Sequence, residues 1–288
     1  MKWPIGILID NFHLDFPEAI RKAAEIGVQG IQIGSIGKPG VGRLDIHMSA
    51  GKRKAYKDYV NRLGLEISAL CGDIGGFKAP DVIEERVETT KRIIDLALDM
   101  GTRIVSSHIG PIPMEPAHPR YQMMLDACGR VAQYAESVGA CYAIETGPET
   151  SGVLRNFLDD ISSPGIGVNL DPANFVMITG EDPARAVRLL GKDIVHTHVK
   201  DGVMNHFIGT ELAYGVVPDT ENVKPGSRTQ TPIGQGSVNW ITYLNALQEV
   251  HYRGYLTIER EGGEDRESEI RLAYQTLKNF LDQRGLLL

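Results

Sequence analysis

The sequence has few cysteines, no excess of basic residues and no long apolar run. Its three cysteines, Cys71, Cys128 and Cys141, are widely spaced and form no Cys-x-x-Cys pair. A disulfide framework is therefore not expected, and a reducing, cytoplasmic location is predicted. No segment approaches the roughly 20 apolar residues of a membrane span. The net charge of -7 argues against a nucleic-acid partner, because phosphate binding needs a basic surface.

The sequence also lacks the marks of a secreted protein. Met1-Lys2-Trp3-Pro4 leads directly into a strand-like segment, without the charged leader, apolar stretch and cleavage site of a signal peptide. What is present is an ordinary globular composition, with 42% hydrophobic and 23% charged residues. We therefore expect a protein of the cytoplasm that has no membrane partner.

Short apolar runs alternate with longer amphipathic segments along the whole chain, which predicts strands alternating with helices. The predicted strands are residues 4–10, 30–34, 66–73, 103–110, 141–146, 166–171, 194–199 and 255–259. The predicted helices are residues 17–26, 49–62, 81–100, 119–137, 153–160, 183–190, 238–250 and 267–284. Five glycines follow helical segments, where a left-handed C-cap is favoured: Gly27, Gly64, Gly101, Gly139 and Gly191.

Strict alternation of strands and helices implies parallel strands joined by right-handed crossovers. A closed barrel and a doubly wound open sheet both satisfy this pattern. Eight units without a break in composition favour the barrel, so residues 1–288 are predicted to form a single α/β domain, a (β/α)8 TIM barrel. The sequence does not fix the oligomeric state, although barrels of this size often form homo-oligomers.

One connection is much longer than the others. Residues 202–237 follow the seventh predicted strand and are rich in Gly, Pro, Thr and Asn. Long loops in compact domains are usually functional or disordered. Because this segment leaves the carboxyl end of a strand, it is predicted to lie over the active-site mouth. A surface insertion without function is the alternative.

Ionisable residues collect at the carboxyl ends of the later strands, which is where TIM barrels carry their chemistry. The residues at these ends are His108, Glu145, Asp171, His198 and Glu259. Three carboxylates on one rim would repel one another, and burying an unpaired charge is costly. A bound cation would neutralise the carboxylates and accept an imidazole nitrogen.

The sequence therefore predicts one divalent metal ion held by Glu145, Asp171, His198 and Glu259. This oxygen-rich set suits Mn²⁺ best, with Mg²⁺, Co²⁺ and Zn²⁺ as alternatives. In the other interpretation, each residue pairs separately with a lysine or arginine of a neighbouring loop.

Strand geometry separates the two histidines of the seventh strand. His196 and His198 are two residues apart and point to the same side, as does Lys200. His198 is nearer the rim and is the better ligand, whereas His196 lies one layer deeper and is expected to form hydrogen bonds. Lys200 either polarises a substrate oxygen or binds a phosphate, or it remains a solvated charge.

These residues resemble those of the sugar isomerase and epimerase superfamily with the xylose-isomerase-like barrel, and the resemblance covers essentially the whole chain. The superfamily includes ketose 3-epimerases, inosose dehydratases, hydroxypyruvate isomerases and, more distantly, repair enzymes of the endonuclease IV type. The motifs that carry the resemblance are Ile144-Glu145-Thr146, Asn169-Leu170-Asp171-Pro172-Ala173-Asn174, His196-Thr197-His198-Val199-Lys200-Asp201, Gly234-Gln235-Gly236 and Gly254-Tyr255-Leu256-Thr257-Ile258-Glu259.

The resemblance implies the same four metal ligands, and it implies that Glu145 and Glu259 also act as a catalytic acid/base pair. His108 matches a position that commonly contacts substrate. Asn174 stands where many relatives carry a histidine, which weakens the transfer of a contact there. The histidines of this chain do not supply the trinuclear zinc cluster of the repair nucleases. His108, Lys200, Asn174 and Glu261 are the predicted substrate-binding residues.

The predicted reaction on a carbohydrate is isomerisation or epimerisation. The metal would stabilise an enediolate formed by proton abstraction next to a carbonyl. Two alternatives remain open. The same site could expel a hydroxide and act as a dehydratase on a keto-sugar or keto-inositol, or the barrel could bind sugar without catalysis. The triplet at residues 234–236 is only a weak phosphate-binding signal, because a turn before a helix accounts for it equally well.

Overall fold

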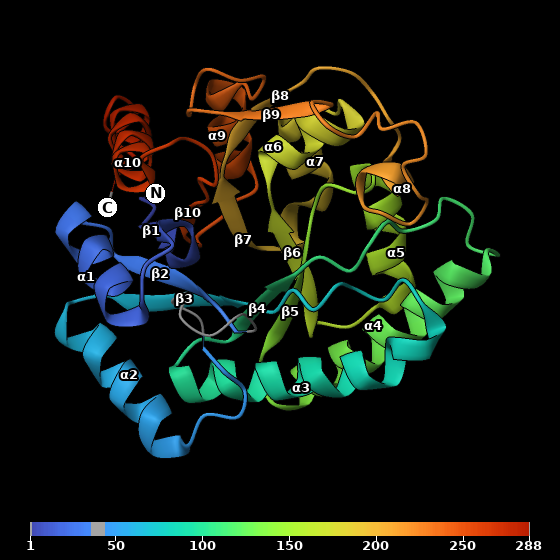
Figure 1. Cartoon of the computed structure of the whole chain (residues 1–288), viewed down its shortest axis with the longest axis horizontal. Helices are drawn as coiled ribbons and strands as arrows, with labels where there is room; N and C mark the ends of the chain where they lie inside the picture. The colour runs from blue at the N-terminus through green and yellow to red at the C-terminus, as the bar shows by residue number, and fades with distance from the viewer. Residues whose placement is uncertain (1, 36–43, 288) are drawn as a thin grey trace.

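The computed structural model describes residues 2–35 and 44–287 and confirms the predicted TIM barrel. Eight parallel strands close in the order β1-β10-β7-β6-β5-β4-β3-β2, with helices arranged around them (Figure 1). The barrel strands are β1 Ile5–Leu8, β2 Gly30–Gly34, β3 Glu66–Cys71, β4 Ile104–Ser107, β5 Cys141–Glu145, β6 Ile166–Leu170, β7 Ile194–Val199 and β10 Leu256–Ile258.

The helices follow the predicted segments closely. The long helices are α1 Phe16–Ile26, α2 Ala50–Arg62, α3 Ile83–Met100, α4 Pro119–Ser137, α5 Ser151–Ile161, α7 Pro183–Leu190, α9 Trp240–Glu249 and α10 Arg266–Asp282. The sequence did not predict the short helix α6 Pro172–Asn174 and the π-helical turn Phe175–Thr179, which together follow β6. This insertion begins directly after Asp171 and shapes one wall of the site.

Local sequence signals set the helix ends. Helix α1 begins after Asp15, whose side chain accepts a hydrogen bond from the Glu18 amide at 2.9 Å. It ends at Gly27, whose φ of 93° gives the left-handed cap that glycine adopts most easily. The predicted left-handed cap at Gly191 is wrong: its φ of 31° and ψ of -99° lead instead into a short 3₁₀ turn before β7.

The barrel strands are buried on both faces, as expected of parallel strands covered by helices. Every residue of β2 and of β6 is buried. The chain ends meet beside the barrel (Figure 1), where the Trp3 amide donates to the Leu286 carbonyl at 2.8 Å. None of the helices in the described residues has the length and apolarity that crossing a membrane requires.

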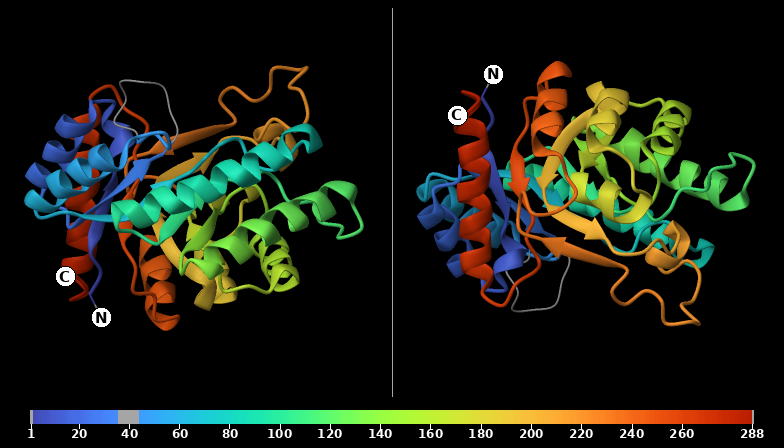
Figure 2. Two further views of the ribbon diagram at one scale, coloured as in Figure 1. Left: turned by 90° about the horizontal axis from the view of Figure 1, so that it is seen from below. Right: turned by 90° about the horizontal axis from the view of Figure 1, so that it is seen from above.

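The long connection after β7 contains regular structure that the sequence did not reveal. Strand β8, Asp201–Met204, pairs antiparallel with β9, Arg228–Thr231, and a short helix, α8 Thr210–Ala213, lies between them. Figure 2 shows the connection between β8 and β9 extending away from the barrel strands. We refer to β8, β9 and the residues between them as the hairpin segment.

A single buried carboxylate holds the base of the hairpin segment. Asp201 Oδ2 accepts hydrogen bonds from the Gly234 amide at 2.8 Å, the Gly236 amide at 3.2 Å and the Trp240 indole at 3.0 Å. A Cβ on Gly236 would lie 2.1 Å from Asp201 Oδ1, so only glycine fits there. The Gly234-Gln235-Gly236 triplet therefore wraps a carboxylate of this chain, and its amides are not a phosphate cradle.

Candidate metal centre

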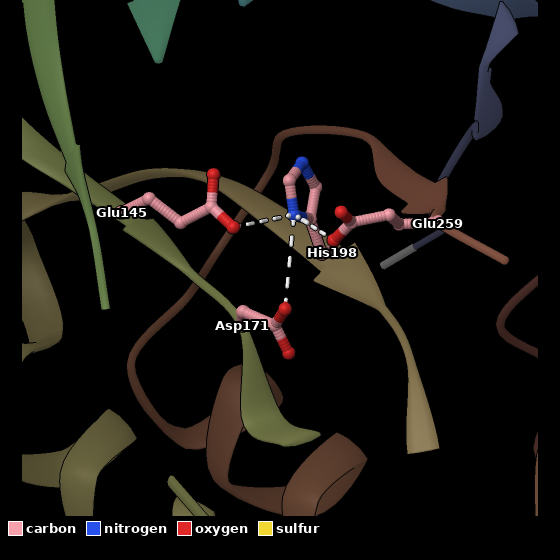
Figure 3. Close-up of side chains that lie close together, drawn as sticks. All are labelled: Glu145, Asp171, His198 and Glu259. Carbon is pink, nitrogen blue, oxygen red and sulfur yellow. Dashed lines mark ion pairs between the residues drawn. The ribbon is translucent and has the colours of Figure 1, made fainter. Parts of the chain in front are cut away.

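Four predicted residues converge at the carboxyl ends of neighbouring strands. Glu145 ends β5, Asp171 directly follows β6, His198 lies on β7 and Glu259 directly follows β10. Because these strands adjoin one another in the barrel, one ligand atom from each side chain lies within 4.8 Å of the other three. Figure 3 shows the four side chains directed toward one another. Their role as metal ligands remains a prediction.

The imidazole of His198 lies at the centre of the cluster. Its Nδ1 is 2.9 Å from Glu259 Oε2, 3.4 Å from Glu145 Oε1 and 4.0 Å from Asp171 Oδ2 (Figure 3). All four side chains are at most 10% exposed. The site thus presents three carboxylates and one imidazole to a shared, buried point.

The donor atoms of this cluster fit a cation. Asp171 Oδ2, His198 Nδ1 and Glu259 Oε2 are buried, and within residues 2–35 and 44–287 none forms a well-directed hydrogen bond; their near polar neighbours are one another, Glu145 and Lys200, at ion-pair distances. Buried polar atoms normally form such bonds, because leaving them without one costs free energy. A divalent ion with a preference for oxygen and nitrogen ligands would satisfy all three atoms together.

The acidities also reflect this crowding. Burial raises the pKa of Asp171 to about 7; Lys200 opposes this shift and Glu259 adds to it. Burial alone would raise the pKa of Glu259, but Lys200 and His198 outweigh it and lower that pKa to about 2. Burial acts in the same direction on Glu145, yet His108 and His198 hold its pKa well below the usual range. Glu145 and Glu259 are therefore ionised at neutral pH and ready to bind a cation, whereas at Asp171 a cation would have to displace a proton.

A buried polar network beneath the cluster orients His198. Its Nε2 lies 2.9 Å from Gln32 Oε1, and because an amide oxygen only accepts, Nε2 carries the hydrogen. Burial lowers the pKa of His198, but Glu145 and Glu259 outweigh it and raise that pKa well above its usual value, so Nδ1 also carries a proton when no cation is bound. A bound cation would displace that proton and take the Nδ1 lone pair, while Gln32 holds Nε2. Asn169 extends the network, with Nδ2 2.7 Å from Ser106 Oγ and Oδ1 3.1 Å from His196 Nδ1.

His196 occupies the deeper layer that its spacing predicts. It is buried, and its Nε2 lies 3.0 Å from Thr257 Oγ1. Burial, with a further contribution from His198, lowers its pKa to about 3. His196 therefore remains a neutral hydrogen-bonding residue below the cluster.

The cluster opens into a pocket of about 520 Å³. The four predicted substrate-binding residues line it: His108, Lys200, Asn174 and Glu261. The His108 Nδ1 is 3.5 Å from Glu145 Oε2, and the side-chain amide of Asn174 donates through Nδ2 to the Thr146 carbonyl at 3.0 Å. Contact with a substrate remains a prediction for each of them.

Lys200 forms ion pairs both with carboxylates of the cluster and with Glu261 in the pocket. Its Nζ lies 3.5 Å from Asp171 Oδ2, 3.2 Å from Glu259 Oε2 and 3.3 Å from Glu261 Oε2. Lys200 is 9% exposed and Glu261 is 60% exposed. The ammonium is thus committed to three carboxylates and is not a solvated charge.

Sequence reasoning missed several residues that line the same pocket. Asp10 and Asn11 lie two and three residues after the end of the apolar strand β1, so the rule that identified Glu145 also applies to them. Tyr214 and Arg228 come from the hairpin segment, where no periodic pattern points to a buried position. Gln32 supports His198 from the middle of β2, and its signal is a polar residue inside an apolar strand.

A further buried carboxyl lies near the pocket without lining it. Glu149 is 5% exposed, and no side chain in the described part of the chain forms a hydrogen bond with its carboxyl group, although the backbone of Ile112 lies close enough to favour the charged form. Burial raises its pKa to about 8, against a usual value of 4.5. Because the folded state holds this proton more tightly than the unfolded state does, the contribution of Glu149 to stability is lost as the pH rises from about 4.5 to about 8.

Substituting Glu149 with glutamine should remove that loss. The wild type should lose about 2 kcal/mol of unfolding free energy between pH 6 and pH 8 through this group, and Glu149→Gln should not. The difference in unfolding free energy, variant minus wild type, is therefore expected to be about 2 kcal/mol larger at pH 8 than at pH 6. Urea unfolding at both pH values measures the difference. Glu115→Gln, at an exposed position, is the matched control and should show no such change. An equal stability difference at both pH values would contradict a buried, protonated Glu149.

Comparison with known proteins agrees with the fold. Residues 20–280 match the family model of the xylose isomerase-like TIM barrel. The structure resembles a xylose isomerase domain protein from Planctomyces limnophilus, with a TM-score of 0.79 and 22% identity over 98% of both chains.

Two further solved structures share the fold. The probable 3-DHS dehydratase AsbF of Bacillus anthracis has a TM-score of 0.73 and 17% identity, over 97% of this chain and 99% of AsbF. An L-ribulose 3-epimerase has a TM-score of 0.72 and 16% identity, over 98% of this chain and 95% of the epimerase. At these identities the likeness establishes the fold, and the same fold carries an epimerase in one protein and a dehydratase in another.

Proposed function

The chain belongs to the xylose isomerase-like TIM barrel family, and from this membership and the site we propose that it is a divalent-metal-dependent isomerase or epimerase of a small carbohydrate. One observation carries the proposal. Glu145 and Glu259 approach the same buried centre from opposite ends of the row β5-β6-β7-β10, with Asp171 and His198 between them. Two carboxylates that reach one buried point from different strands support proton transfer on two faces of a bound substrate.

A metal held by Glu145, Asp171, His198 and Glu259 would supply Lewis-acid stabilisation for the negative charge that develops on a substrate carbonyl oxygen. The chain supplies the proton transfers. Glu259, whose low pKa keeps it ionised, accepts a proton from the carbon next to the carbonyl. Glu145 is ionised before the reaction, so the proton that it returns on the other face first reaches it from His108, whose Nδ1 lies 3.5 Å from its Oε2. Burial lowers the pKa of His108, but Glu145 outweighs it and raises that pKa to about 9, so the imidazole holds this proton; solvent water then takes the proton from Glu259 and reprotonates His108.

A dehydratase is the second candidate, and one contact favours it. Elimination needs an acid for the departing hydroxide in addition to the base. The Lys200 Nζ, 3.2 Å from Glu259 Oε2, brings such a proton donor beside the proposed base. The two reactions share the first proton abstraction and diverge at the group next to the abstracted proton.

Proton NMR in heavy water tests both candidates. The protein is incubated with a panel of ketoses and inososes, either with Mn²⁺ or with chelator, and each sample receives excess chelator before the spectrum is recorded. Metal-dependent deuterium uptake at one carbon, together with a new epimer or isomer, is the expected result. New vinylic or deoxy-keto signals would assign the dehydratase instead.

A sugar-binding barrel without activity predicts a different outcome. Ligands from the panel would then raise the melting temperature of the metal-loaded protein while no carbon exchanged its proton. That combination, found for every sugar that binds, would overturn the proposed function.

A further inference from the structure

The pocket has one strong cation that no carboxylate of the described chain neutralises. Of the lysine and arginine side chains that line it, Lys200 contacts three carboxylates, whereas Arg228 forms no ion pair or side-chain hydrogen bond within residues 2–35 and 44–287. Arg228 is half-buried. An arginine held in a substrate pocket without a partner is a site for an anionic group, because its planar guanidinium matches the geometry of an oxyanion.

The position of Arg228 is fixed by its neighbours. It opens β9 and pairs with Met204 of β8. Gln230, two residues along the same strand, faces the same side and also lines the pocket. Its Oε1 accepts hydrogen bonds from Arg260 Nη1 at 3.0 Å and the Glu261 amide at 2.9 Å, and its Nε2 donates to the Glu259 carbonyl at 3.3 Å. These bonds tie the strand that carries Arg228 to the segment that carries the proposed base.

The phenol of Tyr214 lies in the same region of the pocket. Burial raises its pKa and nearby Glu145 adds to the shift, while the charges of Lys200 and Arg228 act in the opposite direction. The Tyr214 ring lies 5.6 Å from the ring of His108. A Cβ on Gly147 would fall 2.6 Å from the Tyr214 hydroxyl oxygen, so a glycine there allows the phenol to approach β5. Tyr214 is thus a second polar group of the pocket, close enough to Arg228 and to Glu145 for both charges to act on it.

We propose that Arg228, assisted by Tyr214, binds an anionic group at the end of the substrate away from the metal centre, so that the natural substrate is an acidic sugar such as a ketose carrying a carboxylate. This inference rests on the proposed function, since it names the substrate class of the same site. A carboxylate is favoured over a phosphate because one guanidinium matches one carboxylate. The Gly234 and Gly236 amides that could have cradled a phosphate are bonded to Asp201.

The test uses three ligands that differ at one position: D-fructose, D-fructuronate and D-fructose 6-phosphate. Isothermal titration with the Mn²⁺-loaded protein measures each dissociation constant. We expect the uronate to bind about 10- to 100-fold more tightly than fructose, and we expect Arg228→Gln to bring the ratio of the two affinities to about 1. Arg228→Lys should retain part of the advantage. Arg185→Gln, an exposed arginine on α7, is the matched control.

Each result decides the proposal. A preference for the 6-phosphate that Arg228→Gln abolishes would sustain anion recognition and assign phosphate as the group. Equal affinities for all three ligands, a preference that survives Arg228→Gln, or failure of the uronate to bind at millimolar concentration would overturn it. The readout is binding, so the result is distinct from the heavy-water experiment: an anion-selective pocket without proton exchange would leave this inference intact while the proposed reaction failed.

Discussion

Replacing Glu259 by glutamine is expected to reduce turnover by about 10²- to 10⁴-fold, the range that general acid–base catalysis contributes. Glutamine has nearly the same shape as glutamate, but its amide cannot accept the substrate proton. The low pKa of Glu259, maintained by Lys200 and His198 against burial, is the property that the substitution removes. Glu145→Gln should reduce turnover over the same range, because the return of the proton fails instead.

The measurement is the rate of deuterium uptake by the substrate found in the heavy-water screen, for each variant at saturating Mn²⁺. Metal affinity is determined alongside, so that a lost proton acceptor can be distinguished from a lost ligand. Glu264→Gln, at an exposed position in the loop after β10, is the control and should exchange at the wild-type rate. Wild-type turnover in either Glu145→Gln or Glu259→Gln would show that neither carboxylate moves the proton as proposed.

The barrel was predictable because its signal is repeated. Each strand is a short apolar run and each helix a longer amphipathic one, so eight independent segments support the same topology. The predicted helices at 119–137 and 183–190 coincide with α4 and α7. The four candidate ligands were predictable for a related reason: parallel strands bring their carboxyl ends to one rim, so a polar residue at each end must lie near the others.

The hairpin segment was not predictable in this way. Strand β9 has the sequence Arg-Thr-Gln-Thr, which has no apolar face to reveal a strand. Its position depends on Asp201 and Gln230, whose hydrogen bonds join residues 29 to 39 positions apart. In the sequence alone, a polar side chain that forms hydrogen bonds with a distant segment cannot be distinguished from one that is exposed to solvent. Arg228 was missed for this reason, although it lies in the pocket.

Gln32 and Glu149 were missed because burial of a polar side chain is decided by tertiary packing. Gln32 lies on a strand whose residues are all buried, and its partner is 166 positions away in the sequence. Glu149 lies between a strand and a helix, where the sequence favours an exposed acid. The sequence thus located the rim of the site and His196 beneath it, whereas Gln32, Glu149 and the pocket residues of the hairpin segment required the fold.

Replacing Asp171 by asparagine is expected to separate a metal centre from a network of ion pairs. The substitution keeps Oδ1, which accepts hydrogen bonds from the Ala173 amide at 2.8 Å and the Asn174 amide at 3.2 Å. It changes Oδ2, which is buried and forms no well-directed hydrogen bond in the described part of the chain. Metal affinity should fall by more than the roughly 10- to 100-fold that loss of an outer-shell partner costs.

The thermal response follows from that loss of affinity. At a metal concentration 100 times its dissociation constant, the wild type gains about 2.7 kcal/mol, a rise in melting temperature of roughly 5 to 10 °C. Asp171→Asn should show no such rise at the same concentration. A matched control is available within the chain: Asp182 is also followed by Pro-Ala and accepts from the Ala184 amide at 3.0 Å, but it lies away from the cluster. Asp182→Asn should respond to metal as the wild type does.

The metal-free proteins supply the deciding comparison. If the cluster is built for a cation, Asp171 is a strained, buried charge in its absence, and metal-free Asp171→Asn should be at least as stable as the metal-free wild type at pH 8. If instead Asp171 is held by Lys200, 3.5 Å away, as part of a structural ion-pair network, the substitution leaves a buried ammonium with one fewer partner and lowers stability with or without metal. Urea unfolding in chelator distinguishes the two, and a clear loss of stability there would count against the metal centre.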